Sequence, residues 1–442
     1  MPDGIHLKIS LILRVALGLL TLQAALFGQG VPTQNGPAAD NALVRTLIER
    51  IDQLEKRVNE LEAEKRARLV TGTPSVAPVV PEAQATAPTP APTQTATHKD
   101  HDSVPPPDSV GSYPALHLSG FSDINFSATD RKGDSSGFNE GQFILHMSSA
   151  LSPRVNFFGE ISLTARADGG QGSPAAPGFN VEVERSIIRF DQSDHLKVSF
   201  GRYHTPINYW NTAFHHGSWL QTTISRPEMV QFGGSLLPVH FLGALAEGSV
   251  PLGGMNLHYS TGLGNGRGAV ISRGGDFGDV NNNRALIMSL YSQPDHPYGL
   301  QFGASFYRDK ITPAAGLPAR EWIQSAHVVW QKENPEFIAE FANVSHTPIG
   351  SQRVFRSQAW YLQTAYRLPF GDRLWKPYYR FDYIHVPIGD TIFSLVQNLA
   401  GSTVGVRYDV SSFAAFKLEY RNQQRRGIPR INGVFAQTSF TF

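Results

Sequence analysis

Most of the chain consists of short stretches in which apolar and polar residues alternate. Between residues 155 and 166, one set of alternate positions holds Val, Phe, Gly, Ile, Leu and Ala, and the other holds Asn, Phe, Glu, Ser, Thr and Arg. Because successive side chains of a β-strand point to opposite faces, this pattern predicts strands with one apolar and one polar face. Strands are expected at 115–128, 138–150, 154–166, 180–191, 196–203, 238–249, 254–263, 284–293, 299–308, 320–333, 336–345, 355–369, 374–388, 399–410, 413–424 and 432–442.

The connections between these strands alternate in length. Tight turns are expected at 151–153, 192–195, 250–253, 294–298, 334–335, 370–373 and 411–412, and longer loops rich in Gly, Asn or Asp lie between them. Short turns on one rim and long loops on the other are typical of outer-membrane barrels, whereas a soluble sandwich has no reason to keep this alternation. The expected fold is therefore all-β: a transmembrane antiparallel β-barrel of about 16 strands over residues 113–442, preceded by a short α-helical coiled coil.

Residues 1–30 have the order of a secretory signal peptide. Lys8 and Arg14 precede an apolar stretch at 15–22, and small residues follow it. A retained membrane anchor is the alternative, but the apolar stretch is short. The expected location is the bacterial outer membrane, with the N-terminal extension in the periplasm.

Residues 40–69 carry a heptad repeat with β-branched residues at one core position and Leu at the other: Val44, Leu47, Ile51, Leu54, Val58 and Leu61. This pattern predicts a parallel coiled coil, either a dimer or a trimer. Residues 70–112 are rich in Pro, Ala and Thr and contain no aromatic residue, which predicts a disordered linker. His98 and His101 lie in this linker, where a solvated polar patch is favoured over a metal site.

Composition excludes several classes of protein. The 442 residues have a net charge of +1, and no cysteine is present. Disulfides, thiolate metal sites and cysteine nucleophiles are therefore excluded, and the balanced charge argues against a nucleic-acid partner. After residue 30, no run approaches the roughly 20 apolar residues that a transmembrane helix needs.

The longest loop, from His204 to Leu237, is the third long loop of the predicted barrel. It is rich in aromatic and basic residues, and its acid content is low. The candidates for a pore constriction in and beside it are Arg202, His204, His215, His216 and Arg226. Aromatic packing with satisfied histidines is the alternative interpretation. No metal and no cofactor are expected.

Polar alternate positions, if they face inward, bring a set of basic residues into the lumen. These candidate lumen charges are Arg166, Lys197, Arg367, Arg380, Arg407, Lys417 and Arg421. Because arginine binds anions bidentately, such residues favour a weak preference for anions. On the fourth predicted strand, Arg185 and Arg189 occupy the same alternate positions as Val181 and Val183 and therefore share their face. Turning both arginines inward requires either a β-bulge or different strand bounds.

The chain ends in Phe442, on the apolar face of the last predicted strand. This terminal aromatic resembles the signal read by the barrel-assembly machinery.

The heptads, the linker and the barrel opening LHLSGFSDINF, residues 116–126, resemble porins of the phosphate-selective O and P type. The resemblance implies a barrel, a homotrimer and a channel whose third loop folds into the lumen. That family has lysines at the eyelet and this loop has none, so phosphate selectivity is not carried over.

The expected function is a porin: a passive diffusion channel for small hydrophilic solutes. The alternative is a tether or adhesin that uses the barrel as an anchor and the coiled coil as the interaction module. An enzyme is not expected, because nothing orders His215, His216, Ser218 and Asn211 as nucleophile, base and orienter. The expected partners are two further copies of the chain, outer-membrane lipid, the barrel-assembly machinery, and peptidoglycan or a periplasmic protein at the coiled coil.

Overall fold

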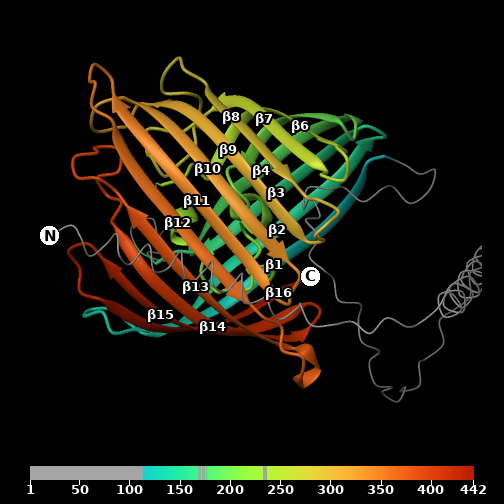
Figure 1. The fold of residues 1–442 in the computed structure, drawn as a ribbon, viewed down its shortest axis with the longest axis vertical. Coiled ribbons are helices and arrows are strands. Elements are labelled where there is room, and N and C mark those ends of the chain that lie inside the picture. Colours follow the sequence, from blue (N-terminus) through green and yellow to red (C-terminus); the bar gives the residue numbers. More distant parts are fainter. Residues whose placement is uncertain (1–112, 168–170, 172–174, 176, 232–235) are drawn as a thin grey trace, which may run out of the picture. The chain divides into compact units, whose positions relative to one another are not determined.

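The computed structural model describes residues 113–167, 171, 175, 177–231 and 236–442. They form a closed antiparallel barrel in which each strand pairs with its neighbours in sequence and β1 pairs with β16 (Figure 1). The strands are β1 (Ala115–Thr129), β2 (Gly137–Ser152), β3 (Val155–Ala165), β4 (Phe179–Ser193), β5 (Leu196–His204), β6 (His240–Val250), β7 (Leu257–Asn265), β8 (Ala285–Ser292), β9 (Leu300–Ile311), β10 (Ala319–Gln331), β11 (Glu336–Pro348), β12 (Phe355–Ala365), β13 (Trp375–His385), β14 (Leu399–Ser411), β15 (Ala414–Arg425) and β16 (Ile431–Thr441).

The sixteen predicted strands and their antiparallel order are confirmed. Among the described residues of the connections, three short helices occur: α3 (Trp210–Ala213), η1 (Glu228–Val230) and η2 (Gly371–Arg373). The twelfth strand ends at Ala365, four residues earlier than predicted; beyond it Tyr366 and Leu368 still donate to the carbonyls of Pro377 and Trp375, but Pro377 has no amide proton to donate in return. No helix in the described part of the chain is long and apolar enough to cross a membrane. The predicted signal peptide, coiled coil and linker lie outside the described residues.

A β-bulge in β4 resolves the phase of its arginines. Glu160 of β3 pairs with Arg185, but the next residue, Ile161, pairs with Val183, so Glu184 is the extra residue. Beyond the bulge the alternation changes face: Val183 is exposed, whereas Arg185 and Arg189 are buried. The bulge therefore turns both arginines inward, and it turns Glu184 inward as well.

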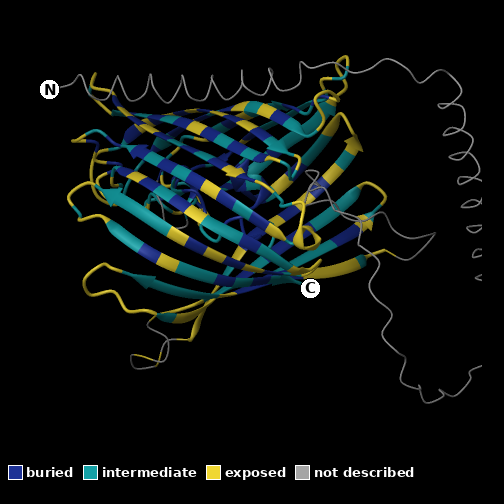
Figure 2. Ribbon diagram, turned by 60° about the horizontal axis from the view of Figure 1, so that its bottom comes forward, coloured by how far each residue is buried: buried dark blue, intermediate teal, exposed yellow. Residues whose placement is uncertain are grey.

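The outward face of the barrel is apolar. Buried and exposed residues alternate along the strands (Figure 2), and large apolar side chains on the exposed positions include Leu118, Val181, Phe200, Val404 and Leu418. An apolar outward band is what a barrel presents to lipid.

The inward face is less polar than the sequence pattern predicts. Ile287 of β8, Ile323 of β10 and Ile338 of β11 are fully buried, and they belong to one apolar cluster with Trp210 and Phe214 of the β5–β6 connection. The expectation that inward positions are polar is therefore wrong for these positions of β8, β10 and β11. The reason is that these positions face packed protein inside the barrel instead of water.

The seam between β1 and β16 closes on the last residue. The amide of Gly120 donates to the carbonyl of Phe442 (2.9 Å), and the amide of Phe442 donates to the carbonyl of Gly120 (3.1 Å). The Phe442 ring lies 5.5 Å from that of Phe143, and a Cβ on Gly120 would come within 2.6 Å of the Phe442 ring. Glycine at position 120 therefore makes room for the terminal aromatic ring across the seam.

Replacing Phe442 with Asp is expected to reduce the amount of folded barrel in the outer membrane severalfold. The substitution would put a carboxylate in the place of a ring that packs across the seam. Strands β1 and β16 must pair along this seam to close the barrel, because each has an unpaired edge until they do. Heat-modifiable mobility of the outer-membrane fraction measures this. Phe413→Asp is the matched control, because Phe413 is an exposed aromatic residue in the neighbouring β14–β15 turn. Equal yields of the two variants would contradict a special role for Phe442.

Candidate functional site

The connection between β5 and β6, residues 205–239, is called the lumen loop here, because its described residues, 205–231 and 236–239, lie inside the barrel. It begins and ends on adjacent strands, yet its described residues bond to β11, β13, β14 and β15 on the opposite wall. Tyr209 and Trp210 are almost fully buried. The lumen loop therefore crosses the barrel, as expected for the third long loop.

Wall carboxylates accept hydrogen bonds from the backbone of the lumen loop. Glu340 Oε1 on β11 accepts from the amides of Tyr209 (2.9 Å) and Trp210 (2.6 Å), where α3 begins. Glu419 Oε1 on β15 accepts from the amide of Ile224 (2.6 Å), and Asp382 Oδ1 on β13 accepts from that of Glu228 (3.0 Å). These acids satisfy buried backbone donors at Tyr209 and Trp210 and partly buried ones at Ile224 and Glu228.

Wall cations bind the carbonyl groups of the same loop. Arg380 donates to the carbonyls of Ser225 (2.7 Å) and Arg226 (3.0 Å) and pairs with Asp382 at 2.8 Å. Arg407 donates to the carbonyls of Trp219 (2.6 Å) and Gln221 (3.0 Å). Lys417 donates to the carbonyls of Ser218 and Thr223. Three predicted lumen cations are thus buried and hold the loop.

The remaining predicted lumen charges are placed differently. Arg421 pairs with Glu419 at 2.7 Å and lies over the ring of Phe435. Lys197 lies on β5 and lines a cavity. Arg166 and Arg367 lie just beyond the ends of β3 and β12, at the rims of the barrel.

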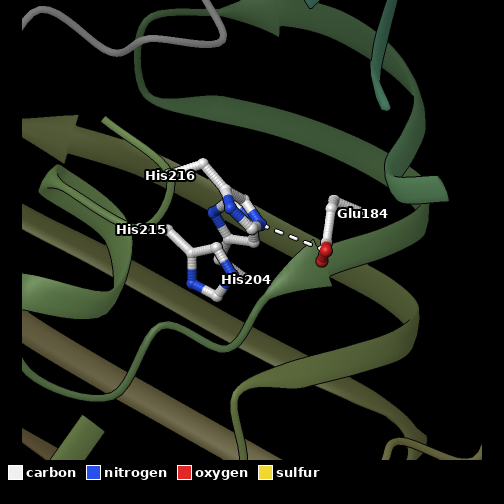
Figure 3. A group of neighbouring side chains, drawn as sticks. All are labelled: Glu184, His204, His215 and His216. Atoms are coloured by element: carbon white, nitrogen blue, oxygen red, sulfur yellow. Dashed lines mark ion pairs between the residues drawn. The ribbon is translucent and has the colours of Figure 1, made fainter. Parts of the chain in front are cut away.

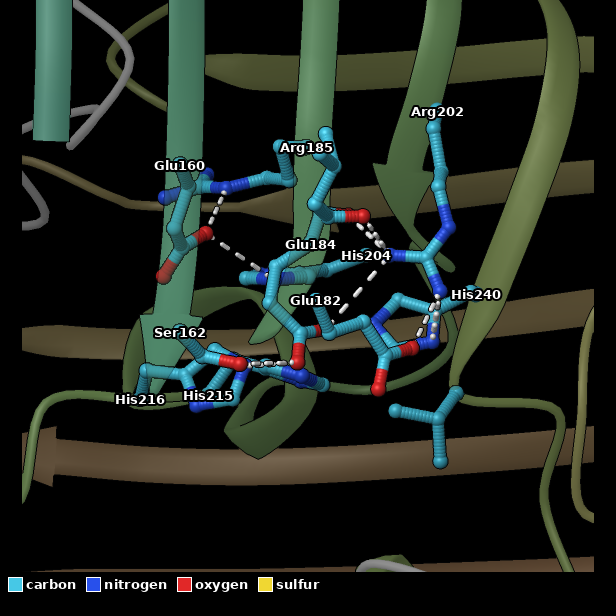
Figure 4. Close-up of polar contacts among 12 residues, drawn as sticks. Glu160, Ser162, Glu182, Glu184, Arg185, Arg202, His204, His215, His216 and His240 are labelled. Carbon is cyan, nitrogen blue, oxygen red and sulfur yellow. Dashed lines mark hydrogen bonds and ion pairs between the residues drawn. The ribbon is translucent and has the colours of Figure 1, made fainter. Parts of the chain in front are cut away.

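The five candidate constriction residues meet where the lumen loop leaves the wall, and Figure 4 shows four of them, Arg202, His204, His215 and His216. Arg202 and His204 are on β5, and His215, His216 and Arg226 are in the lumen loop; all five are buried. Arg202 pairs with Glu182 (3.0 Å), Glu184 (3.5 Å) and Asp276 (2.9 Å), and Arg226 donates to the carbonyl of His215 (2.8 Å). They fasten the base of the loop instead of facing open solvent, because packed protein surrounds them.

The histidines of this group form a compact cluster beside Glu184 (Figure 3). The rings of His204 and His215 stack with their centroids 3.5 Å apart, and the His216 ring is 4.4 Å from that of His215. Burial, with the neighbouring His204 next in importance, lowers the pKa of His215 well below its ordinary value. His216 Nε2 lies 3.2 Å from Glu184 Oε1. Sequence reasoning missed Glu184, and the only signal was the break in alternation from Glu182 to Arg185.

A cavity of about 430 Å³ lies between the lumen loop and the wall of β3–β9. Its lining includes Arg185, Arg189, Lys197 and Glu247 from the strands, together with Thr212 of the loop. Arg185 pairs with Glu160 at 2.5 Å and Arg189 with Asp191 at 2.8 Å. Lys197 forms no ion pair with any residue that the structure describes. The site therefore combines a fixed loop with a polar cavity at its side.

No protein-family model and no curated protein matches the chain, whereas solved structures share its fold. An anion-selective porin from Comamonas acidovorans has a TM-score of 0.53 at 11% identity, covering 74% of this chain and 100% of the porin. The outer-membrane channel DcaP of Acinetobacter baumannii has a TM-score of 0.50 at 10% identity, covering 74% and 97%. The outer-membrane protein OmpT of Vibrio cholerae, in its trimer form, has a TM-score of 0.50 at 11% identity, covering 74% and 99%. The fold is that of outer-membrane porins.

Arg380→Met is expected to loosen the lumen loop. It leaves Asp382 without its guanidinium and two loop carbonyls without a donor, and breaking such a buried pair costs about 3–5 kcal/mol. Hydrogen exchange of the amides at 223–226 should become faster. Arg284→Met is the control, because Arg284 forms an exposed pair with Asp279 of a kind that contributes about 0–1 kcal/mol. Unchanged exchange in Arg380→Met would show that this arginine does not hold the loop.

Proposed function

We propose that the protein is an outer-membrane porin that forms a passive diffusion channel for small hydrophilic solutes. The observation that carries the proposal is the lumen loop, which charged wall residues hold across the barrel while a polar cavity stays at its side. A loop fixed in this way narrows a barrel without filling it. The apolar outward face and the porin fold support a location in the outer membrane, in contact with lipid.

The proposed assembly is a homotrimer inserted by the barrel-assembly machinery. Support comes from the fold shared with a structure described as a trimer form and from the terminal Phe442 at the seam. The coiled coil expected at residues 40–69 is proposed to add contacts between subunits and to reach peptidoglycan or a periplasmic protein.

We place the weak anion preference at the cavity. The charge of Arg202 is offset by three carboxylates, and Arg380 and Arg407 are each paired with an acid. Lys197 is different, because it lines the cavity and has no carboxylate partner among the described residues. An unpaired charge beside a narrow passage acts on a passing ion at reduced dielectric, so it outweighs compensated pairs.

In planar bilayers the purified protein is expected to give discrete conductance steps. Replacing residues 218–226 with a short Gly-Ser linker should enlarge each step, because these residues occupy the lumen and bond to the opposite wall. Shortening the exposed β1–β2 loop at 131–135 should leave the step size unchanged. A tether or adhesin predicts a closed barrel, so the absence of steps from correctly folded protein would refute the channel.

Lys197→Gln is expected to move the reversal potential in a salt gradient toward cations, and Lys197→Glu should move it further. Arg273→Gln is the control, because Arg273 is exposed and pairs with Glu182. Bulk salt also screens such an exposed charge within about 10 Å at 0.1 M. If Lys197→Glu leaves the reversal potential unchanged, the anion bias does not arise at this cavity.

A further inference from the structure

We propose that Glu184, His204, His215 and His216 bind one divalent transition-metal ion of the Zn²⁺ class, which joins the base of the lumen loop to the barrel wall. Glu184 is on β4 and His204 on β5, whereas His215 and His216 belong to the lumen loop. One donor atom from each residue lies within 4.8 Å of the others, and all four residues are buried (Figure 3). An ion held by all four would be a cross-link between wall and loop.

The donor set selects the class of ion. Three imidazole nitrogens and one carboxylate oxygen suit Zn²⁺ and its neighbours Co²⁺, Ni²⁺ and Cu²⁺, whereas Ca²⁺ and Mg²⁺ prefer oxygen ligands. Tetrahedral Zn²⁺ at about 2.0–2.1 Å from nitrogen needs its donors roughly 3.4 Å apart. Reaching that spacing from 4.8 Å or less requires the stacked rings of His204 and His215 to tilt apart, because a metal ion lies in the plane of each imidazole that binds it.

A hydrogen-bond network fixes the donor atom of His215. The amide nitrogen of Asn211 donates to the carbonyls of Thr205 (2.9 Å) and Val239 (3.0 Å), which sets the orientation of this amide. Its oxygen then lies 2.9 Å from His215 Nδ1 and can only accept. The proton of His215 is therefore on Nδ1, and the lone pair is on Nε2. Such outer hydrogen bonds are the usual means of orienting a metal-binding histidine.

The other two histidines each have one ring nitrogen close to an oxygen atom outside the cluster. His204 Nε2 lies 3.3 Å from Glu160 Oε2, which Arg185 holds in place. A proton on that nitrogen leaves the His204 lone pair on Nδ1. His216 Nδ1 lies 3.3 Å from the amide oxygen of Gln142, which leaves its Nε2 facing Glu184 Oε1 at 3.2 Å. This nitrogen and this oxygen are already close to the roughly 3.4 Å spacing of two ligands of a tetrahedral ion.

Glu184 is also oriented from outside the cluster. Ser162 donates to its Oε1 at 2.8 Å. Arg202 donates to Nδ1 of His240 (3.1 Å), so His240 carries its proton on Nε2, which lies 2.7 Å from Glu184 Oε2. His240 is thus a positioning residue for the carboxylate and not a ligand (Figure 4). A second grouping of Glu182, Glu184 and His240 is less suited to a metal, since Arg202 already pairs with both of its carboxylates.

Packing alone explains only part of this arrangement. Two neutral imidazole rings stack favourably in a buried site, and the contact between His204 and His215 needs nothing more. Stacking does not require three histidines each to place a hydrogen-bond acceptor behind the ring and a donor atom near one carboxylate. A metal site requires outer hydrogen bonds that turn the donor atom of each ligand toward one common point.

The test is metal binding by the full chain, purified in detergent without a polyhistidine tag and stripped with a chelator. We expect it to bind one Co²⁺ per chain with the intense visible bands of a four-coordinate site, and Zn²⁺ should displace the Co²⁺. The double variant His215→Gln/His216→Gln should lose the bands. Asn211→Ala should bind Co²⁺ about 10–100-fold more weakly, as expected when a ligand loses its orienting partner. The matched control, His98→Gln/His101→Gln, removes two histidines elsewhere and should bind like the wild type.

Wild-type protein that binds no Co²⁺ would overturn the proposal, whatever the variants do. So would a folded double variant that keeps the bands, or a control variant that loses them. If the double variant fails to show heat-modifiable mobility, Glu184→Gln takes its place, and retention of full binding by that variant would equally overturn the site. Binding is measured without any conductance, so failure here leaves the channel function untouched.

Discussion

The structure depends on the need to hydrogen-bond a segment of backbone that is buried inside a barrel. The described residues of the lumen loop form little regular structure, so only some of their amides and carbonyls bond within the loop, as the amide of Phe214 does with the carbonyl of Trp210. Each buried group left unpaired would cost about 1–3 kcal/mol. The wall supplies the missing partners: Glu340, Asp382 and Glu419 accept from amides, while Arg380 and Arg407 donate to carbonyls. Charged side chains of the wall thus supply hydrogen bonds that a neighbouring strand would otherwise supply.

This use of charge has an electrostatic consequence. Several of the charged residues engaged with the loop are also paired with an opposite charge, as Arg380 is with Asp382 and Arg407 with Asp409. Such pairs present little net field to a passing ion. Ion preference must then come from the few charges outside these pairs, of which Lys197 is the clearest. The number of arginines in the lumen is therefore a poor guide to selectivity.

The fold was predictable because its signals are local. Period-two alternation and turn residues mark each strand, and the length of 205–239 marks the loop that enters the lumen. The partners of that loop were not predictable, because Tyr209 and Glu340 are far apart in sequence. Glu184 was missed since a single extra residue in β4 moves it to the inner face. The apolar inner positions, such as Ile338, have a strand pattern that looks the same whether lipid or a packed loop covers it.

The lumen loop also divides the circumference of the barrel into two unequal parts. Strands β11 and β13–β15 hold the loop through bonds to particular atoms, so their inward residues are constrained together. The wall of β3–β9 mostly borders the cavity, where side chains meet water. Residues of that wall that line the cavity without bonding to the loop, such as Lys197, can vary one at a time without releasing the loop. Related channels could therefore differ in the solutes that they admit while the anchoring half of the barrel stays the same.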